Sequence, residues 1–213
     1  MKVVIAWIVL ASLPFLQAAR RPVRLLPVDE APECSGFSAF RTELLDVVRT
    51  KDVDALMRVT DANVRLSFDD TRGHSELRLR WLNAGSGRDF WSEFKRVLEL
   101  GGSCRDGVEF VAPYVHTAWP SGVDAYDHRA LVSRNVPLRQ RADPASPILT
   151  TLDHAIVRLI EPDAFEKPWL EVETPAGVRG YLPASAMRSA IDMRAYFSKT
   201  PAGWRLTTWI GGD

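Results

Sequence analysis

Residues 130–188 decide the expected fold, and they read ALVSRNVPLRQRADPASPILTTLDHAIVRLIEPDAFEKPWLEVETPAGVRGYLPASAMR. Apolar runs of strand length alternate here with turns rich in proline, glycine and aspartate, such as residues 143–147 and 175–177. Short strands at near-regular spacing with such turn signals predict an antiparallel barrel or sandwich. A packed barrel presents no obvious catalytic groups, so this stretch favours binding or scaffolding over catalysis.

Four motifs of this stretch follow one another in order: an Asn-Val-Pro-Leu-Arg strand at 135–139, a polar loop at 143–149, Trp-Leu-Glu-Val at 169–172 and Gly-Val-Arg-Gly-Tyr-Leu at 177–182. In this order they resemble a bacterial SH3-type domain, the kind appended to cell-envelope proteins. The resemblance implies a small all-β barrel that binds a cell-wall peptide or another protein. Pro137 and the acidic loop at 161–167 depart from the family pattern.

Trp169 and Tyr181 are the expected ligand-binding residues, by analogy with the aromatic-lined recognition surfaces of SH3 domains. Large aromatic rings can hold a peptide or a glycan by stacking. The chain has seven tryptophans, and burial in the core is the alternative role for each of them because large aromatic side chains are mostly buried.

The N-terminal residues 1–19 read as a signal peptide, with Lys2 before the apolar run Val3–Leu16 and small residues at the end. We therefore expect a periplasmic or secreted protein. The run is short for a membrane-spanning helix and contains Pro14, so no stable membrane span is expected after the signal is removed.

Cys34 and Cys104 are the two cysteines of the chain. An even count in an exported protein predicts one disulfide, and two buried thiols are the alternative. Such a bond would close a loop of about 70 residues and stabilise the fold by roughly 4 kcal/mol in the chain-entropy model.

The segment before the barrel has helical periodicity at 38–50, 75–82 and after Asp89, with strands expected at 64–68 and 108–111. Together with the terminal strand Trp204–Ile210, this order is loosely similar to nuclear-transport-factor-two-like α+β domains. The similarity raises the hypothesis that the C-terminal hairpin completes the N-terminal domain, with the barrel inserted between them.

The expected fold class is therefore α+β: a helix-rich N-terminal part, then a small SH3-like all-β barrel and a C-terminal β-hairpin. The expected divisions are a signal peptide at 1–19, an extended tail at 20–35, a helical α+β domain at 36–127, the barrel at 128–190 and the hairpin at 191–213.

Glu33-Cys34-Ser35-Gly36-Phe37 resembles the nucleophile motif of NlpC-type cell-wall cysteine peptidases. A cysteine just before a helix lies at the positive end of the helix dipole, which favours its thiolate. Against this, the family's upstream Tyr/Trp-Gly-Gly segment is missing, and neither His74 nor His116 lies in the hydrophobic strand that carries the family's base. Cys34 is therefore the catalytic residue of the runner-up hypothesis only.

Charge and motifs exclude several other classes. The 27 basic residues balance the 27 acidic ones, and no basic cluster interleaves with aromatics, so nucleic acid is not an expected partner. The four histidines lack metal-ligand spacing, and phosphate-binding and dinucleotide motifs are missing, so no metal site or cofactor is predicted. Asp69-Asp70 could bind a cation, but a turn is the commoner role for such a pair.

The sequence thus predicts a non-catalytic cell-envelope protein that binds a peptide or protein partner. Two alternatives remain open: a cysteine peptidase that uses Cys34, and a purely structural barrel that braces the N-terminal domain.

Overall fold

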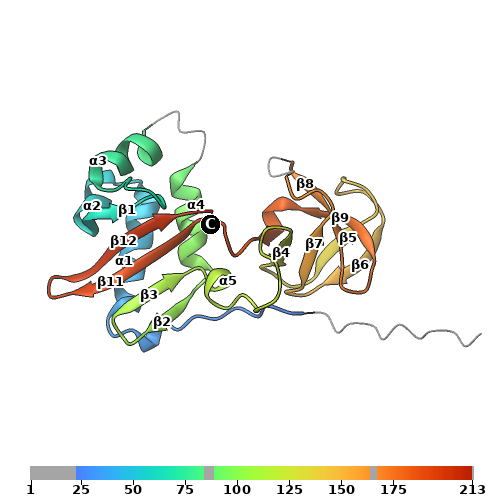
Figure 1. Cartoon of the computed structure of the whole chain (residues 1–213), viewed down its shortest axis with the longest axis horizontal. Coiled ribbons are helices and arrows are strands. Elements are labelled where there is room, and N and C mark those ends of the chain that lie inside the picture. Colours follow the sequence, from blue (N-terminus) through green and yellow to red (C-terminus); the bar gives the residue numbers. More distant parts are fainter. Residues whose placement is uncertain (1–22, 84–88, 164–166, 213) are drawn as a thin grey trace, which may run out of the picture.

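The computed structural model describes residues 23–83, 89–163 and 167–212, so the predicted signal peptide lies outside the described residues. The strands of one sheet are β1 (Thr60–Arg65), β2 (Ser103–Arg105), β3 (Glu109–Ala112), β11 (Arg194–Thr200) and β12 (Gly203–Ile210). They are ordered β1-β12-β11-β3-β2, and β1 runs parallel to β12 while the other neighbours are antiparallel. Strands from the first third of the chain and from its C-terminal part therefore lie in one sheet (Figure 1).

The second sheet has seven strands in the order β10-β4-β7-β8-β9-β5-β6, and each neighbouring pair is antiparallel. The strands are β4 (His128–Leu131), β5 (Val136–Arg139), β6 (Ile148–Leu152), β7 (Ile156–Leu159), β8 (Trp169–Glu173), β9 (Arg179–Pro183) and β10 (Met187–Arg188). Where β9 meets β5, a Cβ at Gly180 would lie 2.7 Å from the carbonyl oxygen of Arg139. Only glycine lets the two backbones approach this closely.

The predicted fold class was wrong. The described chain is mostly β, with two sheets of five and seven strands, and not a helix-rich N-terminal part followed by a small SH3-like barrel. The expected helical segments do form, but they are short and cover a sheet. Hydrophobic periodicity reports the local conformation of each segment and says nothing about which distant strands pair.

The helices are α1 (Phe37–Thr50), α2 (Val53–Arg58), α3 (His74–Leu77), α4 (Phe90–Glu99) and α5 (Tyr114–Thr117), with a π-helical turn at Arg78–Leu82 and 3-10 turns at Ala31–Glu33 and Ala184–Ala186. Helices α1 and α2 precede β1 in the chain, α3 and α4 lie between β1 and β2, and α5 follows β3. The Asp52 carboxylate caps α2 by accepting a hydrogen bond from the Ala55 amide at 2.9 Å. Asp89 caps α4 in the same way through the amides of Trp91 and Ser92. Each cap satisfies an amide that the first helical turn leaves without a partner.

Aromatic side chains fix α1 and α4 against the first sheet. The Phe37 ring of α1 lies 4.0 Å from the Phe110 ring and 5.0 Å from the Trp204 ring, measured between centroids. Phe90 and Phe94 of α4 contact Trp209 at 5.4 and 5.2 Å. Burying each such ring stabilises the fold by about 1.5–3 kcal/mol. This cluster is therefore the principal core of the first unit, by which we mean the five-stranded sheet and its helices; the second unit is the seven-stranded sheet.

The predicted disulfide is confirmed, because Cys34 and Cys104 are bonded with 70 residues between their positions in the sequence. The bond joins the segment before α1 to β2. The same segment is held by the Glu30 amide, which donates to the Gly102 carbonyl, and by the Glu30 carboxylate, which accepts from the Cys104 amide. The N-terminal segment is thus fastened to the edge of the first sheet.

A smaller apolar cluster lies between the two sheets. Leu25 of the N-terminal segment packs there with Tyr114, Val115, Ala130 and Ile156. In Figure 1 this segment runs in blue along the molecule from the second sheet towards the first. No helix in the described part of the chain has the length and apolar character needed to cross a bilayer.

Candidate binding site

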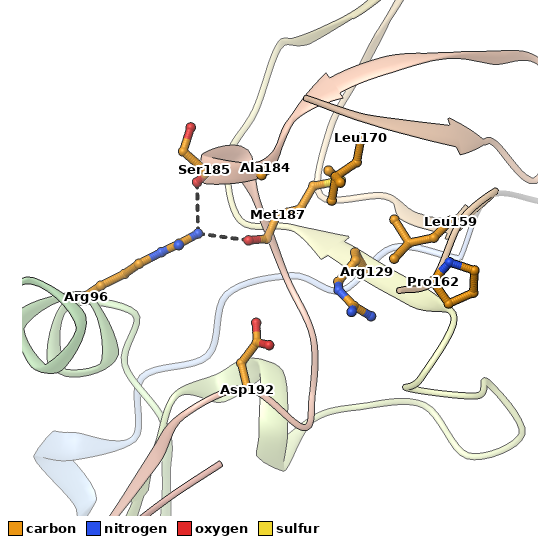
Figure 2. Close-up of a pocket in the computed structure, with 9 residues that line it drawn as sticks. All are labelled: Arg96, Arg129, Leu159, Pro162, Leu170, Ala184, Ser185, Met187 and Asp192. Atoms are coloured by element: carbon orange, nitrogen blue, oxygen red, sulfur yellow. Dashed lines mark hydrogen bonds between the residues drawn. The ribbon is translucent and has the colours of Figure 1, made fainter. Parts of the chain in front are cut away.

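A cavity of about 320 Å³ lies where α4 of the first unit approaches β10 of the second (Figure 2). Its lining residues come from five separate parts of the chain: Arg96, Arg129, Leu159, Pro162, Leu170, Ala184, Ser185, Met187 and Asp192. Because both units contribute, this cavity exists only when the two sheets are docked against each other.

Apolar side chains from three strands form one side of the cavity. Leu159 of β7, Leu170 of β8 and Met187 of β10 are buried members of the core of the seven-stranded sheet. Their backbones are held by the sheet ladder, so these side chains are fixed before any ligand arrives. A rigid apolar surface with a few charged groups around it is the usual construction of a ligand site.

Arg129 of β4 is the most buried charged residue of the lining, with 7% of its surface exposed. Its Nη1 donates to the carbonyl oxygens of Ala125, Tyr126 and His128 at 3.2, 3.0 and 2.8 Å. No carboxylate among the described residues forms an ion pair with it. Burial lowers the pKa of this guanidinium, while the negative charge of Asp192 acts in the opposite direction. An arginine remains charged under such shifts, so the cavity contains a buried cation.

Arg96 of α4 connects the two units at the rim of the cavity. Its Nη2 donates to the carbonyl oxygens of Ser185 at 2.8 Å and Met187 at 2.9 Å, as the dashed lines in Figure 2 show. Burial lowers the pKa of Arg96, and the nearby positive charge of Arg188 adds to this effect. The Nη2 group of Arg96 is therefore engaged in holding the cavity wall together.

Asp192 supplies the negative charge of the lining and lies in the connector between β10 and β11. Its Oδ2 accepts a hydrogen bond from the Ser189 amide at 2.8 Å, which fixes the carboxylate. Figure 2 shows the carboxylate turned towards the space between Arg96 and Arg129. Burial lowers the pKa of both arginines, and the charge of Asp192 only partly opposes that effect. Asp192 forms a direct ion pair with neither arginine among the described residues.

The structure places the two predicted ligand-binding aromatics close together but outside the cavity lining. Trp169 of β8 lies opposite Pro183, and Tyr181 of β9 lies opposite Glu171. Their half-buried side chains share the face opposite Leu170, since side chains alternate along a strand. The Tyr181 hydroxyl donates to Glu171 Oε2 at 3.4 Å. That these two residues bind a ligand stays a prediction.

Cys34, the catalytic residue of the runner-up hypothesis, carries no free thiol because it is bonded to Cys104. The two histidines that were considered as its base are engaged elsewhere. His74 Nε2 lies 3.1 Å from the Thr60 carbonyl oxygen, and His116 contacts the Ala190 carbonyl and the Tyr196 hydroxyl. This geometry offers the peptidase hypothesis no nucleophile.

The pair Asp69-Asp70 forms a turn. Asp69 Oδ1 accepts from the Thr71 amide at 2.7 Å, and Asp70 pairs with Arg72 at 2.8 Å. The hydrogen bonds from Thr71 lower the pKa of Asp69, which is the signature of a local turn. No group of three potential metal ligands occurs among the described residues.

Comparisons with known proteins leave the cavity as the main guide to function. The chain matches no protein-family model, no curated protein and no solved structure.

The nine lining residues include no histidine, cysteine or lysine, so a nucleophile with an adjacent base of the usual kind is missing from them. What the lining does offer is an apolar surface with converging charges, which suits binding.

Sequence reasoning missed Arg96, Arg129 and Asp192. The sequence held one local signal for Arg129, which is the placement of a charged residue within the short strand His-Arg-Ala-Leu. Arginine is rarely buried in such a strand unless it has a partner. Nothing local marks Arg96 or Asp192, which resemble ordinary surface charges until the two units dock.

Proposed function

We propose that this protein is a non-catalytic binding protein of the cell envelope that holds a peptide or protein partner at the cavity between its two sheets. The observation that carries the proposal is the convergence of two arginines and one aspartate on an apolar wall, in a cavity of about 320 Å³. A cavity in which apolar side chains lie beside convergent polar groups is a reasonable place to look for a binding site.

Two further observations support a location in the envelope. The Cys34–Cys104 disulfide is typical of proteins that work in oxidising compartments outside the cytosol. Residues 1–19 have the pattern of a signal peptide. The motif order over 130–188, which resembles that of bacterial SH3-type domains, is the reason for expecting a cell-wall peptide or a protein as the partner.

The size of the cavity limits how much of the partner can enter. Ligand sites commonly enclose about 300–1,000 Å³, so this cavity is at the lower end of that range. We expect it to take one residue or one chain end of a larger partner, with the remainder lying outside.

The proposal is tested by blocking the cavity from its rim. Ser185 is an exposed lining residue, so Ser185→Trp fills the opening with little effect on the core. Ser133→Trp is the matched control, because Ser133 is also exposed, also accepts a hydrogen bond through its carbonyl and lies outside the lining. The measurements are co-sedimentation with purified cell wall and affinity for peptides released from it.

We expect wild-type protein and Ser133→Trp to bind equally and Ser185→Trp to lose binding. Equal binding by all three proteins would move the partner away from the cavity. No binding by any of them would favour the structural alternative, in which the second sheet only braces the first. Hydrolysis of cell-wall peptides by protein with a free Cys34 would support the peptidase alternative.

A further inference from the structure

Arg129 has hydrogen-bonding capacity that the protein itself does not use. Its three hydrogen bonds to backbone carbonyls are all donated by Nη1. Its Nε and Nη2 have no acceptor among the described residues. These two nitrogens lie on the same edge of a guanidinium and present parallel N–H groups, the arrangement that a carboxylate accepts in a bidentate manner.

The free edge belongs to a cation that is 7% exposed and lacks an ion-pair partner among the described residues. Burying a charge without a partner is unfavourable, and an anion brought by a ligand would remove that penalty. Figure 2 shows the guanidinium reaching into the cavity between Pro162 and Asp192. The unused donors therefore point to where a ligand would lie.

The charges of the lining favour an anion with a single charge. Arg96, Arg129 and Asp192 are its charged members. Within the lining, two positive charges and one negative charge leave an excess of one, which a carboxylate neutralises. Asp127, outside the lining, is a second negative charge that acts on Arg129, and it further disfavours an anion of higher charge. A phosphate monoester carries more negative charge than this excess, and it would be repelled by Asp192, because like charges in a partly buried site interact strongly.

The apolar wall adds a second requirement. Leu159, Leu170 and Met187 line the cavity together with the charged groups. An apolar side chain next to the ligand's carboxylate would be stabilised by burying its surface against them. The C-terminal residue of a peptide has both features, because its carboxylate and its side chain are attached to the same Cα atom.

We infer that the cavity recognises the free carboxylate end of a peptide whose last side chain is apolar, with the carboxylate on the Nε–Nη2 edge of Arg129 and the side chain on Leu159, Leu170 and Met187. This inference rests on the proposed function, because it names the part of the partner that enters the cavity. Asp192 acts as a selectivity residue that disfavours anions of higher charge.

The test uses two probes of nearly equal shape that differ in charge, N-acetyl-leucine and N-acetyl-leucinamide. Both are titrated into the mature disulfide-bonded chain, and binding is followed by ¹H–¹⁵N NMR shifts. A hydrogen bond to a charged group is worth about 1.5–3 kcal/mol, which corresponds to a preference for the acid of roughly tenfold or more. Equal affinities, or no binding of the acid, would overturn the inference.

Arg129→Gln removes the charged edge, and Arg134→Gln is the matched control on an exposed arginine just after β4. We expect the first variant to lose at least tenfold in affinity for the acid, with little change for the amide, and the second to bind like the wild type. An acid affinity unchanged in Arg129→Gln would contradict the inference.

Asp192→Asn provides a test that leaves Arg129 intact, which matters because Arg129 also holds three backbone carbonyls. The asparagine oxygen can still accept from the Ser189 amide, so the connector keeps its anchor. We expect tighter binding of the acid by several-fold, and competition by inorganic phosphate that the wild type resists. Phosphate competing equally well with both proteins would show that Asp192 does not select the anion.

These outcomes are separable from those of the proposed function. If Ser185→Trp abolishes binding of cell-wall peptides while the acid and amide probes bind alike, the cavity is the binding site but the carboxylate is not what it recognises. If the acid probe binds selectively and cell-wall material does not bind, the chemistry of the inference holds and the proposed partner class is wrong.

Discussion

Glu93 Oε1 lies 2.8 Å from Nη2 of Arg188, and this ion pair joins α4 of the first unit to β10 of the second. Arg188 is 1% exposed and also donates to the Met193 carbonyl oxygen. Glu93 and Arg96 are one helical turn apart on α4, and both contact the segment around β10. The cavity wall therefore depends on one face of α4 that carries a carboxylate and a guanidinium.

Removing the carboxylate from this pair should destabilise the protein strongly. Glu93→Gln leaves the buried Arg188 guanidinium without its counter-ion. Breaking a fully buried pair costs about 3–5 kcal/mol, and because the Glu93 side chain is 30% exposed we expect a loss towards or below the lower end of that range. The measurement is the free energy of unfolding in urea. Glu99→Gln is the control on the same helix, where the exposed Lys95–Glu99 pair at 3.2 Å should contribute about 1 kcal/mol or less. Similar losses in both variants would contradict the buried-pair argument.

Loss of the disulfide should destabilise the chain without changing its fold. The bond closes a loop between residues that are 70 positions apart, and a loop of that length contributes roughly 4 kcal/mol in the chain-entropy model. Replacing Cys34 and Cys104 by serine should lower the thermal midpoint and leave the far-UV circular dichroism spectrum unchanged. Mass spectrometry under non-reducing conditions should show the wild-type chain two hydrogens lighter than its reduced form, and a chain of full reduced mass would refute the bond.

The attachment of the N-terminal segment should depend on acid pH through Asp29. Arg41 donates from Nη1 and Nη2 to the two oxygens of Asp29 at 2.8 and 2.7 Å. Burial acts to raise the pKa of Asp29, but the hydrogen bonds and charge of Arg41 outweigh it, and the pKa lies below its ordinary value of 3.8. Since the folded-state pKa is lowered, the stabilisation is present above pH 3.8 and is lost as the pH falls through the folded-state value.

Asp29→Asn should therefore reduce stability at neutral pH and make little difference once the pH is well below 3.8. Unfolding in urea across this pH range measures the difference between the variant and the wild type. Asp46→Asn is the control, because its 3.4 Å pair with Arg49 on α1 is exposed. A stability difference at Asp29 that does not shrink in acid would show that the carboxylate charge is not what holds the segment.

The aromatic face of β8 and β9 can be tested separately from the cavity. Trp169→Ala should lower affinity for cell-wall peptides by about 0.5–1.5 kcal/mol, the usual worth of a stacking contact. Because Trp169 does not line the cavity, binding of N-acetyl-leucine should be unchanged. If Trp169 only braces the structure, Trp169→Ala should instead lower the stability of the protein and leave the binding of cell-wall peptides and of N-acetyl-leucine unaltered.

Local sequence determined much of the secondary structure. The apolar spacing over residues 38–50 predicted the helix that is observed as α1, and the helical periodicity after Asp89 predicted α4, which Asp89 caps. The even cysteine count predicted the disulfide. These features follow from interactions within one turn of helix, or from a simple count, so they can be inferred without knowing the rest of the fold.

Only the tertiary structure decided the fold class and the cavity. The parallel pairing of β1 with β12 places Thr60 beside Leu206, and no local pattern reports a pairing across so long a stretch of chain. The charged groups of the cavity come from α4, β4 and the connector after β10, and nothing in the local sequence brings these three segments together. Docking of the two sheets removes these side chains from water and turns them towards one another, because burial and proximity are properties of the packed molecule and not of any one segment.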